Sequence, residues 1–208
     1  MQRGVNVIEG KAAPFKYENV DTDQIIPSEF LKIMSKRGIG RYCFYRWRYR
    51  EDGSLNPDFI LNNPKYSDAS ILIAGKNFGI GSSRENAVWA LKDMGIKCII
   101  APSFGDIFYM NSVKNLLLCI KLPEEHVEKL QDMAEKIELY LKIDIKNSTI
   151  NYPGGEMKFD LDQTVKERFL KGLDEIETTL TYYGEKIKEY EDKMPSFIIP
   201  KARRFLPD

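Results

Sequence analysis

The chain has 208 residues and a formal net charge of zero, because 31 lysines and arginines balance 31 aspartates and glutamates. With 43% hydrophobic and 30% charged residues it can bury a core, which excludes a disordered chain. The missing basic excess argues against general electrostatic binding of nucleic acid or anionic membranes.

The first seventy residues are predicted to be irregular. The segment 19–27, NVDTDQIIP, is a polar turn that leads into a short apolar run and a proline, and 28–34 has room for one or two helical turns. Residues 36–50, KRGIGRYCFYRWRYR, interleave arginines with aromatic rings. The segment 56–67 is rich in proline and asparagine, which is typical of a loop.

The middle of the chain predicts strands that alternate with helices. Apolar runs predict strands at 71–75, 96–101 and 116–120. Helical spacing predicts helices at 83–94 and 103–115, the second with Ile107, Phe108 and Val113 facing the core. This order predicts parallel strands with helices packed on them.

The last third predicts a helix at 123–138, because proline and acidic residues stand at its start. Alternating apolar and polar residues then predict a hairpin of 139–145 and 148–152. A charged helix is predicted over 165–191, followed by an extended tail. We therefore expect one domain over 1–208 with a C-terminal helical extension near 165–208.

Histidine and cysteine usage narrows the chemistry. The single histidine, His126, lies in a charged helical segment and is predicted to be a solvated side chain. Cys43, Cys98 and Cys119 are widely spaced, so they form neither a disulfide framework nor a Cys-x-x-Cys metal site. The apolar runs stay far below the ~20 residues of a membrane span, and the first ten residues lack the apolar stretch of a signal peptide. We expect a cytoplasmic protein.

The segment 77–85, NFGIGSSRE, is a glycine-bearing loop between a predicted strand and a predicted helix. Its Gly-x-Gly element permits a sharp turn and a close backbone approach to a ligand. Ser82 and Glu85 have the spacing of a capping box at a helix start, where free N–H groups bind anions. Arg84 adds a guanidinium suited to a carboxylate. We predict an anion-binding pocket here, although capping alone also accounts for Ser82 and Glu85.

Several motifs agree in order and spacing with one family. The loop is followed by NAVWAL and IAPSFGDIFYMNS and preceded by NVDTDQIIPSEFLK, and the whole closely resembles the small subunits of 3-isopropylmalate dehydratases. The resemblance covers about 19–122 and continues more loosely near 170–180. It implies an aconitase-like swivel domain, an α/β fold with a mostly parallel, barrel-like sheet and flanking helices.

The resemblance also implies an activity and a partner. The family is a two-chain hydro-lyase that isomerises 2-isopropylmalate to 3-isopropylmalate through 2-isopropylmaleate in leucine biosynthesis. Its large subunit carries a [4Fe–4S] cluster, and the small subunit binds no metal. We therefore expect this chain to act only together with an iron–sulfur large subunit on a small diacid.

By position in the family's motif, Ser82 corresponds to the base that takes the proton next to a carboxylate, and Ser83 and Arg84 correspond to residues that hold a substrate carboxylate. A helix N-terminus lowers a pKa by roughly one unit, far too little to ionise an alkyl hydroxyl near neutral pH. Arg84, backbone donors and a water-poor closed site must supply the rest. Because closure requires the large subunit, we expect the isolated chain to be inactive.

The same resemblance marks further substrate-binding candidates. Thr22 and Asp23 match a family element near the active site, and Gly81 and Asn77 belong to the glycine loop. A mobile loop near 32–55 is expected to sense the side group of the substrate and to touch the large subunit. Arg41 in this loop is the candidate that faces the variable end of the substrate.

Two positions depart from the family pattern and keep other functions open. Asn86 stands where histidine is usual, and Ile80 stands where cysteine is usual. A related hydro-lyase acting on citramalate or citraconate, dimethylmalate or homoaconitate is therefore an alternative. A non-catalytic anion- or RNA-binding module is another, since 36–50 offers arginines and stacking rings, but the zero net charge argues against RNA.

Overall fold

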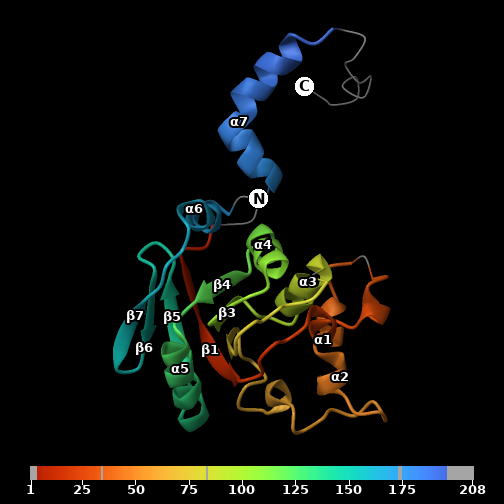
Figure 1. The fold of residues 1–208 in the computed structure, drawn as a ribbon, viewed down its shortest axis with the longest axis vertical. Helices are drawn as coiled ribbons and strands as arrows, with labels where there is room; N and C mark the ends of the chain where they lie inside the picture. The colour runs from red at the N-terminus through yellow and green to blue at the C-terminus, as the bar shows by residue number, and fades with distance from the viewer. Residues whose placement is uncertain (1–3, 34, 83, 173–174, 196–208) are drawn as a thin grey trace. The chain divides into compact units, whose positions relative to one another are not determined.

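A mixed seven-stranded sheet forms the centre of the fold in the computed structural model, with strand order β4-β3-β2-β1-β5-β6-β7 (Figure 1). The structure describes residues 4–33, 35–82, 84–172 and 175–195. Its contacts divide the chain into two compact units, 1–172 and 173–208, and the sheet lies in the first. The predicted mobility of 32–55 and the single domain over 1–208 stay predictions.

Four strands of the sheet run parallel to one another. They are β1 (Val7–Phe15), β2 (Ile71–Ala74), β3 (Cys98–Ala101) and β4 (Leu118–Lys121). All residues of β2 and β3 are buried, which explains why these strands are continuous apolar runs in the sequence. The three strands predicted in the middle of the chain are confirmed.

The prediction of an irregular N-terminal region is wrong for β1. Its sequence, VIEGKAAPF, includes glycine, alanine, proline and charged residues, all of which are poor strand formers. The strand forms because its two halves pair with different neighbours: Val7 to Lys11 with the antiparallel strand β5, and Ala12 to Phe15 with β2. Tertiary pairing therefore overrides local propensity here.

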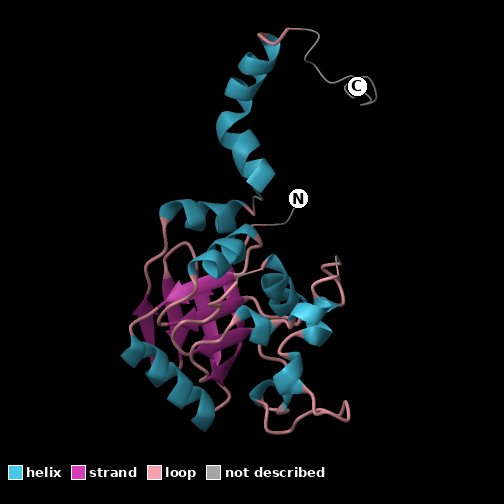
Figure 2. Ribbon diagram, turned by 45° about the vertical axis from the view of Figure 1, so that its right-hand side comes forward, coloured by secondary structure: helices cyan, strands magenta, loops and turns pink. Residues whose placement is uncertain are grey.

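The antiparallel half of the sheet consists of β5 (Tyr140–Asp144), β6 (Thr149–Tyr152) and β7 (Gly155–Lys158). The hairpin that the sequence predicts is β5 and β6. Together with the parallel half it makes a curled sheet with helices on its faces, as Figure 2 shows. The expected α/β fold with flanking helices is confirmed.

Helices cover both faces of the parallel strands. One buried cluster joins Leu72 and Ile99 to α3 (Glu85–Asp93) and α4 (Asp106–Lys114). The other joins Ile71 and Ile100 to α5 (Glu124–Lys136), because alternate strand residues point to opposite faces. The remaining short helices precede β2: α1 (Thr22–Ile25), 3-10 turns at Ser28–Phe30, Ile39–Tyr42 and Ile60–Asn62, and α2 (Tyr45–Arg48).

Two helix predictions need correction. Phe108 of α4 is buried as expected, but Ile107 is 56% exposed, because adjacent helix positions point ~100° apart and Ile107 leaves the face that Phe108 buries. The single helix predicted over 165–191 is two helices, α6 (Gln163–Lys171) and α7 (Glu175–Asp192). Gly172 ends α6 in the left-handed conformation (φ +67°), which is the usual geometry of a helix-terminating glycine.

Among the described residues, no helix combines the length and apolarity needed to span a bilayer.

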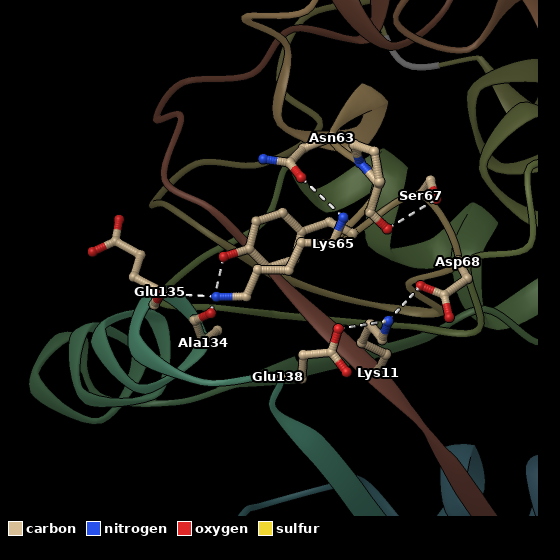
Figure 3. Close-up of polar contacts among 10 residues, drawn as sticks. Lys11, Asn63, Lys65, Ser67, Asp68, Ala134, Glu135 and Glu138 are labelled. Carbon is tan, nitrogen blue, oxygen red and sulfur yellow. Dashed lines mark hydrogen bonds and ion pairs between the residues drawn. The ribbon is translucent and has the colours of Figure 1, made fainter.

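The end of α5 is held by the loop before β2 (Figure 3). The buried Tyr66 hydroxyl donates a hydrogen bond to the carbonyl of Ala134 (2.9 Å), and the Lys65 ammonium donates one to the carbonyl of Glu135 (2.8 Å). Both carbonyls belong to the last turn of α5, where no further helical N–H group is available to them. The loop therefore caps α5 with side chains.

Replacing Tyr66 by phenylalanine is expected to lower the free energy of unfolding by ~1–3 kcal/mol, because the Ala134 carbonyl loses its donor in a buried place. Urea denaturation followed by circular dichroism measures this. Tyr140→Phe on β5, where the side chain is exposed, is the control and should stay within ~0.5 kcal/mol of the parent. Equal stabilities for Tyr66→Phe and the parent would contradict the capping role.

Lys11 on β1 joins the same region by ion pairs to Asp68 (2.9 Å) and Glu138 (3.6 Å), as Figure 3 shows. The hydrogen bond from Lys11 holds the pKa of Asp68 below its usual value, and the same bond raises the pKa of Lys11. The stabilisation is therefore complete near neutral pH. It is lost as the pH falls through the lowered pKa of Asp68 and as it rises through the raised pKa of Lys11.

We expect Asp68→Asn to lower the melting temperature at neutral pH. The difference from the parent should shrink as the pH falls below the ordinary aspartate pKa of about 4 toward the lowered pKa of Asp68, because the parent then loses its own carboxylate charge. Melting curves recorded across pH measure this, with the exposed Asp58→Asn in the preceding loop as the matched control. A difference that stays constant down to the acid end would rule out the ion pair as its cause.

Candidate active site

The glycine loop lies between β2 and α3, where the sequence predicts it. Gly79 and Gly81 have φ of +78° and +88°, a conformation that side-chain-bearing residues rarely adopt. A Cβ on Gly81 would overlap the carboxylate of Asp21, and one on Gly79 would overlap the ring of Phe108. The loop therefore needs both glycines in order to pack against its neighbours.

Backbone hydrogen bonds fasten this loop to the segment before α1. Val20 accepts from the N–H groups of Gly79 (2.7 Å) and Ile80 (3.1 Å), and the N–H of Thr22 donates to Ile80 (2.9 Å). The Thr22 hydroxyl donates to the carbonyl of Ser82 at 3.3 Å. Two motifs that are 60 residues apart in the sequence are thus brought side by side.

A cleft of about 260 Å³ opens where the two motifs meet. Four of the residues that the sequence analysis proposes line it: Thr22, Asp23, Ser82 and Arg84. Among the described residues, three others that it did not single out also line the cleft: Asp21, Ile26 and Ser28. Ser83 lies outside the described residues.

The two carboxylates of the cleft are engaged by the chain's own donors. Asp21 caps α1 by accepting from the N–H of Asp23 (2.7 Å), and the Gln24 side chain accepts from the N–H of Asp21 (2.8 Å). Asp23 accepts from the N–H of Ser28 (2.8 Å) and from the guanidinium of Arg46 on α2 (2.8 Å). Arg84 is the only cationic side chain among the described residues that line the cleft.

The capping box predicted at the start of α3 is wrong. The helix begins at Glu85 with Arg84 as its N-cap, and no side chain caps it. Glu85 instead accepts hydrogen bonds from the indole of Trp89 (3.2 Å) and the amide of Asn115 (2.7 Å), which turns it toward α4. Ser82 is therefore not used for capping, and the start of α3 remains an anion-binding end. A capping box is present instead at the start of α1, where Asp21 and Gln24 form it, and their Asp-x-x-Gln spacing is visible in the sequence.

The structure places the other candidates outside the lining of the cleft. Asn77 braces the loop, because its amide donates to Asn19 (2.8 Å) and accepts from the Ser103 hydroxyl (2.9 Å). Gly81 backs the loop against Asp21. Arg41 donates to the carbonyl of Gly38 (2.9 Å) and lies over the ring of Tyr42. Substrate contact by Asn77, Gly81 or Arg41 stays a prediction.

The arginine of the 36–50 stretch that pairs with a residue of the cleft lining is Arg46, through Asp23, and sequence reasoning did not single it out. The alternation of arginines and aromatics has a packing reason: Phe44 is fully buried and stacks on Trp47, whereas Arg41 and Arg46 are exposed. The N–H of Phe44 donates to the carbonyl of Ile25 (2.7 Å), which joins α2 to α1. Because Phe44 is buried and Tyr42 and Trp47 pack against the core, these three rings are not free to stack on nucleic-acid bases.

Metal ligation by this chain does not fit its cysteines. Cys43, Cys98 and Cys119 are free and buried, and burial raises the pKa of Cys119 to about 12 and that of the other two thiols well above normal. Iron–sulfur clusters bind thiolates, so protonated and dispersed thiols are unsuited to that role. No group of three metal-binding side chains occurs among the described residues.

Comparison with known proteins places the fold and the cleft in one class. The aconitase C-terminal domain family matches residues 3–125, which contain β1 to β4, α1 to α4 and every residue that lines the cleft. A 3-isopropylmalate dehydratase from Methanocaldococcus jannaschii has a similar structure, with a TM-score of 0.62 and 27% identity over 90% of this chain and 98% of that one. The fold and site thus define an aconitase-type C-terminal, or swivel, domain.

Closer relatives narrow the assignment. The 3-isopropylmalate dehydratase small subunit of Rhizobium etli is 50% identical over 89% of this chain and 93% of its own length. The small subunit of Methylorubrum populi is 49% identical over 90% and 94%, and that of Streptococcus suis is 48% identical over the same shares. This chain belongs to the family of 3-isopropylmalate dehydratase small subunits.

Proposed function

We propose that this chain, joined to a large subunit, isomerises 2-isopropylmalate to 3-isopropylmalate by removing water to give 2-isopropylmaleate and adding it back. The observation that carries the proposal is the meeting of Thr22 and Asp23 with Ser82 and Arg84 around one cleft. The names of relatives at about 50% identity support the substrate. The pathway is leucine biosynthesis, and we place the protein in the cytoplasm.

Two residues of the cleft, Arg84 and Ser82, receive distinct tasks. Arg84 binds a substrate carboxylate through its two parallel N–H groups, a geometry that a guanidinium supports. Ser82 takes the proton from the carbon next to that carboxylate, and the electron pair of the broken C–H bond forms the double bond as the C–O bond of the neighbouring carbon breaks. The proton taken by Ser82 and the hydroxide that departs together make up the water removed. Return of water with the opposite orientation then gives the isomer.

The ionisation of Ser82 depends on surroundings that this chain provides only in part. The helix end at α3 contributes roughly one pKa unit and Arg84 contributes further. Ser82 and Arg84 are both exposed, so bulk water still reaches them and screens these charges. A covering surface is needed to exclude water, which supports the requirement for a large subunit.

We place the [4Fe–4S] cluster of the family on the large subunit, because the buried, protonated cysteines described here are unsuited to hold it. The isolated chain should then show no turnover, and activity should appear only in the two-chain complex. Purified small subunit that turns over substrate without a partner would disprove this assignment.

Anaerobic reconstitution with the large subunit tests the proposed function. The ultraviolet absorbance of the unsaturated diacid reports turnover of isopropylmalate, citramalate, dimethylmalate and homocitrate in parallel. Preference for isopropylmalate supports the proposal. Preference for another diacid would keep the chemistry and replace the substrate. A formed complex with an intact cluster and no turnover of any of them would contradict catalysis and favour the binding-module alternative.

A further inference from the structure

Asp23 is the residue of the cleft whose charge needs an explanation. A substrate with two carboxylates must enter a cleft whose described lining has two carboxylates of its own, Asp21 and Asp23, and one cation, Arg84. The formal charge of the lining is therefore negative. Repulsion between these carboxylates and those of the substrate weakens binding. Because the cleft is open to solvent, the repulsion is screened but not abolished.

Arg46 lies where its positive charge offsets the negative formal charge of the cleft lining. Its Nη1 lies 2.8 Å from Oδ2 of Asp23, while Oδ1 of the same carboxylate accepts the N–H of Ser28 at 2.8 Å. Both carboxylate oxygens of Asp23 thus have a donor. With Arg46 included, the charges of the described lining residues, Asp21, Asp23 and Arg84, sum to zero before a substrate binds.

The backbone that carries Arg46 is well anchored. On either side of it, Phe44 and Trp47 pack in the aromatic cluster with Phe15, and the N–H of Phe44 is bonded to Ile25 of α1. The helices that bear Asp23 and Arg46 are therefore joined by main chain as well as by the ion pair. Because the backbone of Arg46 is held in place, its guanidinium loses little conformational entropy when it pairs with Asp23.

We propose that Arg46 is a positioning residue for the dianionic substrate: it fixes the Asp23 carboxylate at the wall of the cleft and cancels its charge, so that a dicarboxylate can bind beside it. This inference rests on the proposed function and adds a residue outside the cleft lining to the determinants of substrate binding. It also explains why α2, from the loop over 32–55, is tied to α1.

A double-mutant cycle tests the inference in the reconstituted two-chain enzyme. Arg46→Gln should raise KM about tenfold and change kcat by less than about twofold, because the uncompensated Asp23 charge opposes binding of substrate. Arg46→Lys, which keeps the charge, should restore KM to within about threefold of the parent. In the Asp23→Asn background, Arg46→Gln should change KM by less than about twofold, since no charge is left to cancel.

The exposed ion pair of Lys76 and Glu18 provides the matched control, because its exposure is similar and neither residue lines the cleft. Lys76→Gln should leave KM unchanged. An unaltered KM in Arg46→Gln overturns the inference. So does an equal effect of Arg46→Gln with and without the Asp23 charge, which would indicate a merely structural role.

A second readout separates this inference from the proposed function. Malonate, a plain dicarboxylate, can be titrated into the full isolated chain and followed by amide chemical shifts at the cleft. Its dissociation constant should rise about tenfold in Arg46→Gln and recover in Asp23→Asn/Arg46→Gln. This pattern without turnover of any diacid would retain the inference and reject the proposed function, whereas turnover without this pattern would do the opposite.

Discussion

Ser82→Ala is expected to lower kcat of the reconstituted enzyme by about 10²–10⁴-fold, the range that a positioned general acid or base contributes. The hydroxyl makes no helix cap, because α3 is capped by Arg84 without a side-chain bond. The carbonyl of Ser82, which accepts from Thr22, remains in the alanine variant. The loss should therefore fall on the chemical step and leave the fold and the complex intact.

The measurement is steady-state turnover together with the binding of the large subunit. Ser67→Ala serves as the matched control, because Ser67 is an exposed serine whose hydroxyl bonds only the nearby Pro64 carbonyl among the described contacts. It should keep full activity. Retention of more than about a tenth of kcat by Ser82→Ala would show that another group takes the proton.

Arg84→Lys is expected to lower kcat/KM by about 10–100-fold. An ammonium keeps the charge but gives up the two parallel hydrogen bonds, and a charge-assisted hydrogen bond contributes ~1.5–3 kcal/mol. The backbone of Arg84 is extended (φ −120°, ψ 142°), a conformation open to lysine, so the fold should be unaffected.

Arg84→Gln removes the charge as well and should lose a further tenfold or more in kcat/KM. A melting temperature equal to that of the parent, measured on both variants, excludes unfolding as the cause. If lysine and glutamine behaved alike and close to the parent, the carboxylate would be held elsewhere. The effects of Ser82 and Arg84 should not add, because both act on the same bound substrate.

Much of the parallel half of the fold is visible in the sequence. The strands β2, β3 and β4 are short apolar runs between turn residues. A strand that is covered on both faces needs apolar side chains at successive positions, which makes it visible in the sequence. The glycine loop is equally visible, because a positive φ at Gly79 and Gly81 requires that residue type. Ser82 and Arg84 follow from the motif that this loop carries.

Other features were not predictable because they depend on contacts between distant segments. The strand β1 has a composition that disfavours strands and forms only between β2 and β5, some 60 and 130 residues away. The choice between Arg41 and Arg46 is likewise invisible in a run of alternating arginines. Burial of Phe44 and packing of Trp47 against the core decide which guanidinium faces Asp23.

The sequence by itself therefore determined the residue types that the chemistry needs: a glycine loop, a serine and an arginine at a helix start, and an acidic turn at 21–24. Their assembly into one cleft was decided only by the tertiary structure. The hydrogen bonds from Gly79 to Val20 and from Thr22 to Ile80 and Ser82 close a span of some 60 residues. Local propensity carries no information about such a closure, because its free energy comes from long-range packing and pairing.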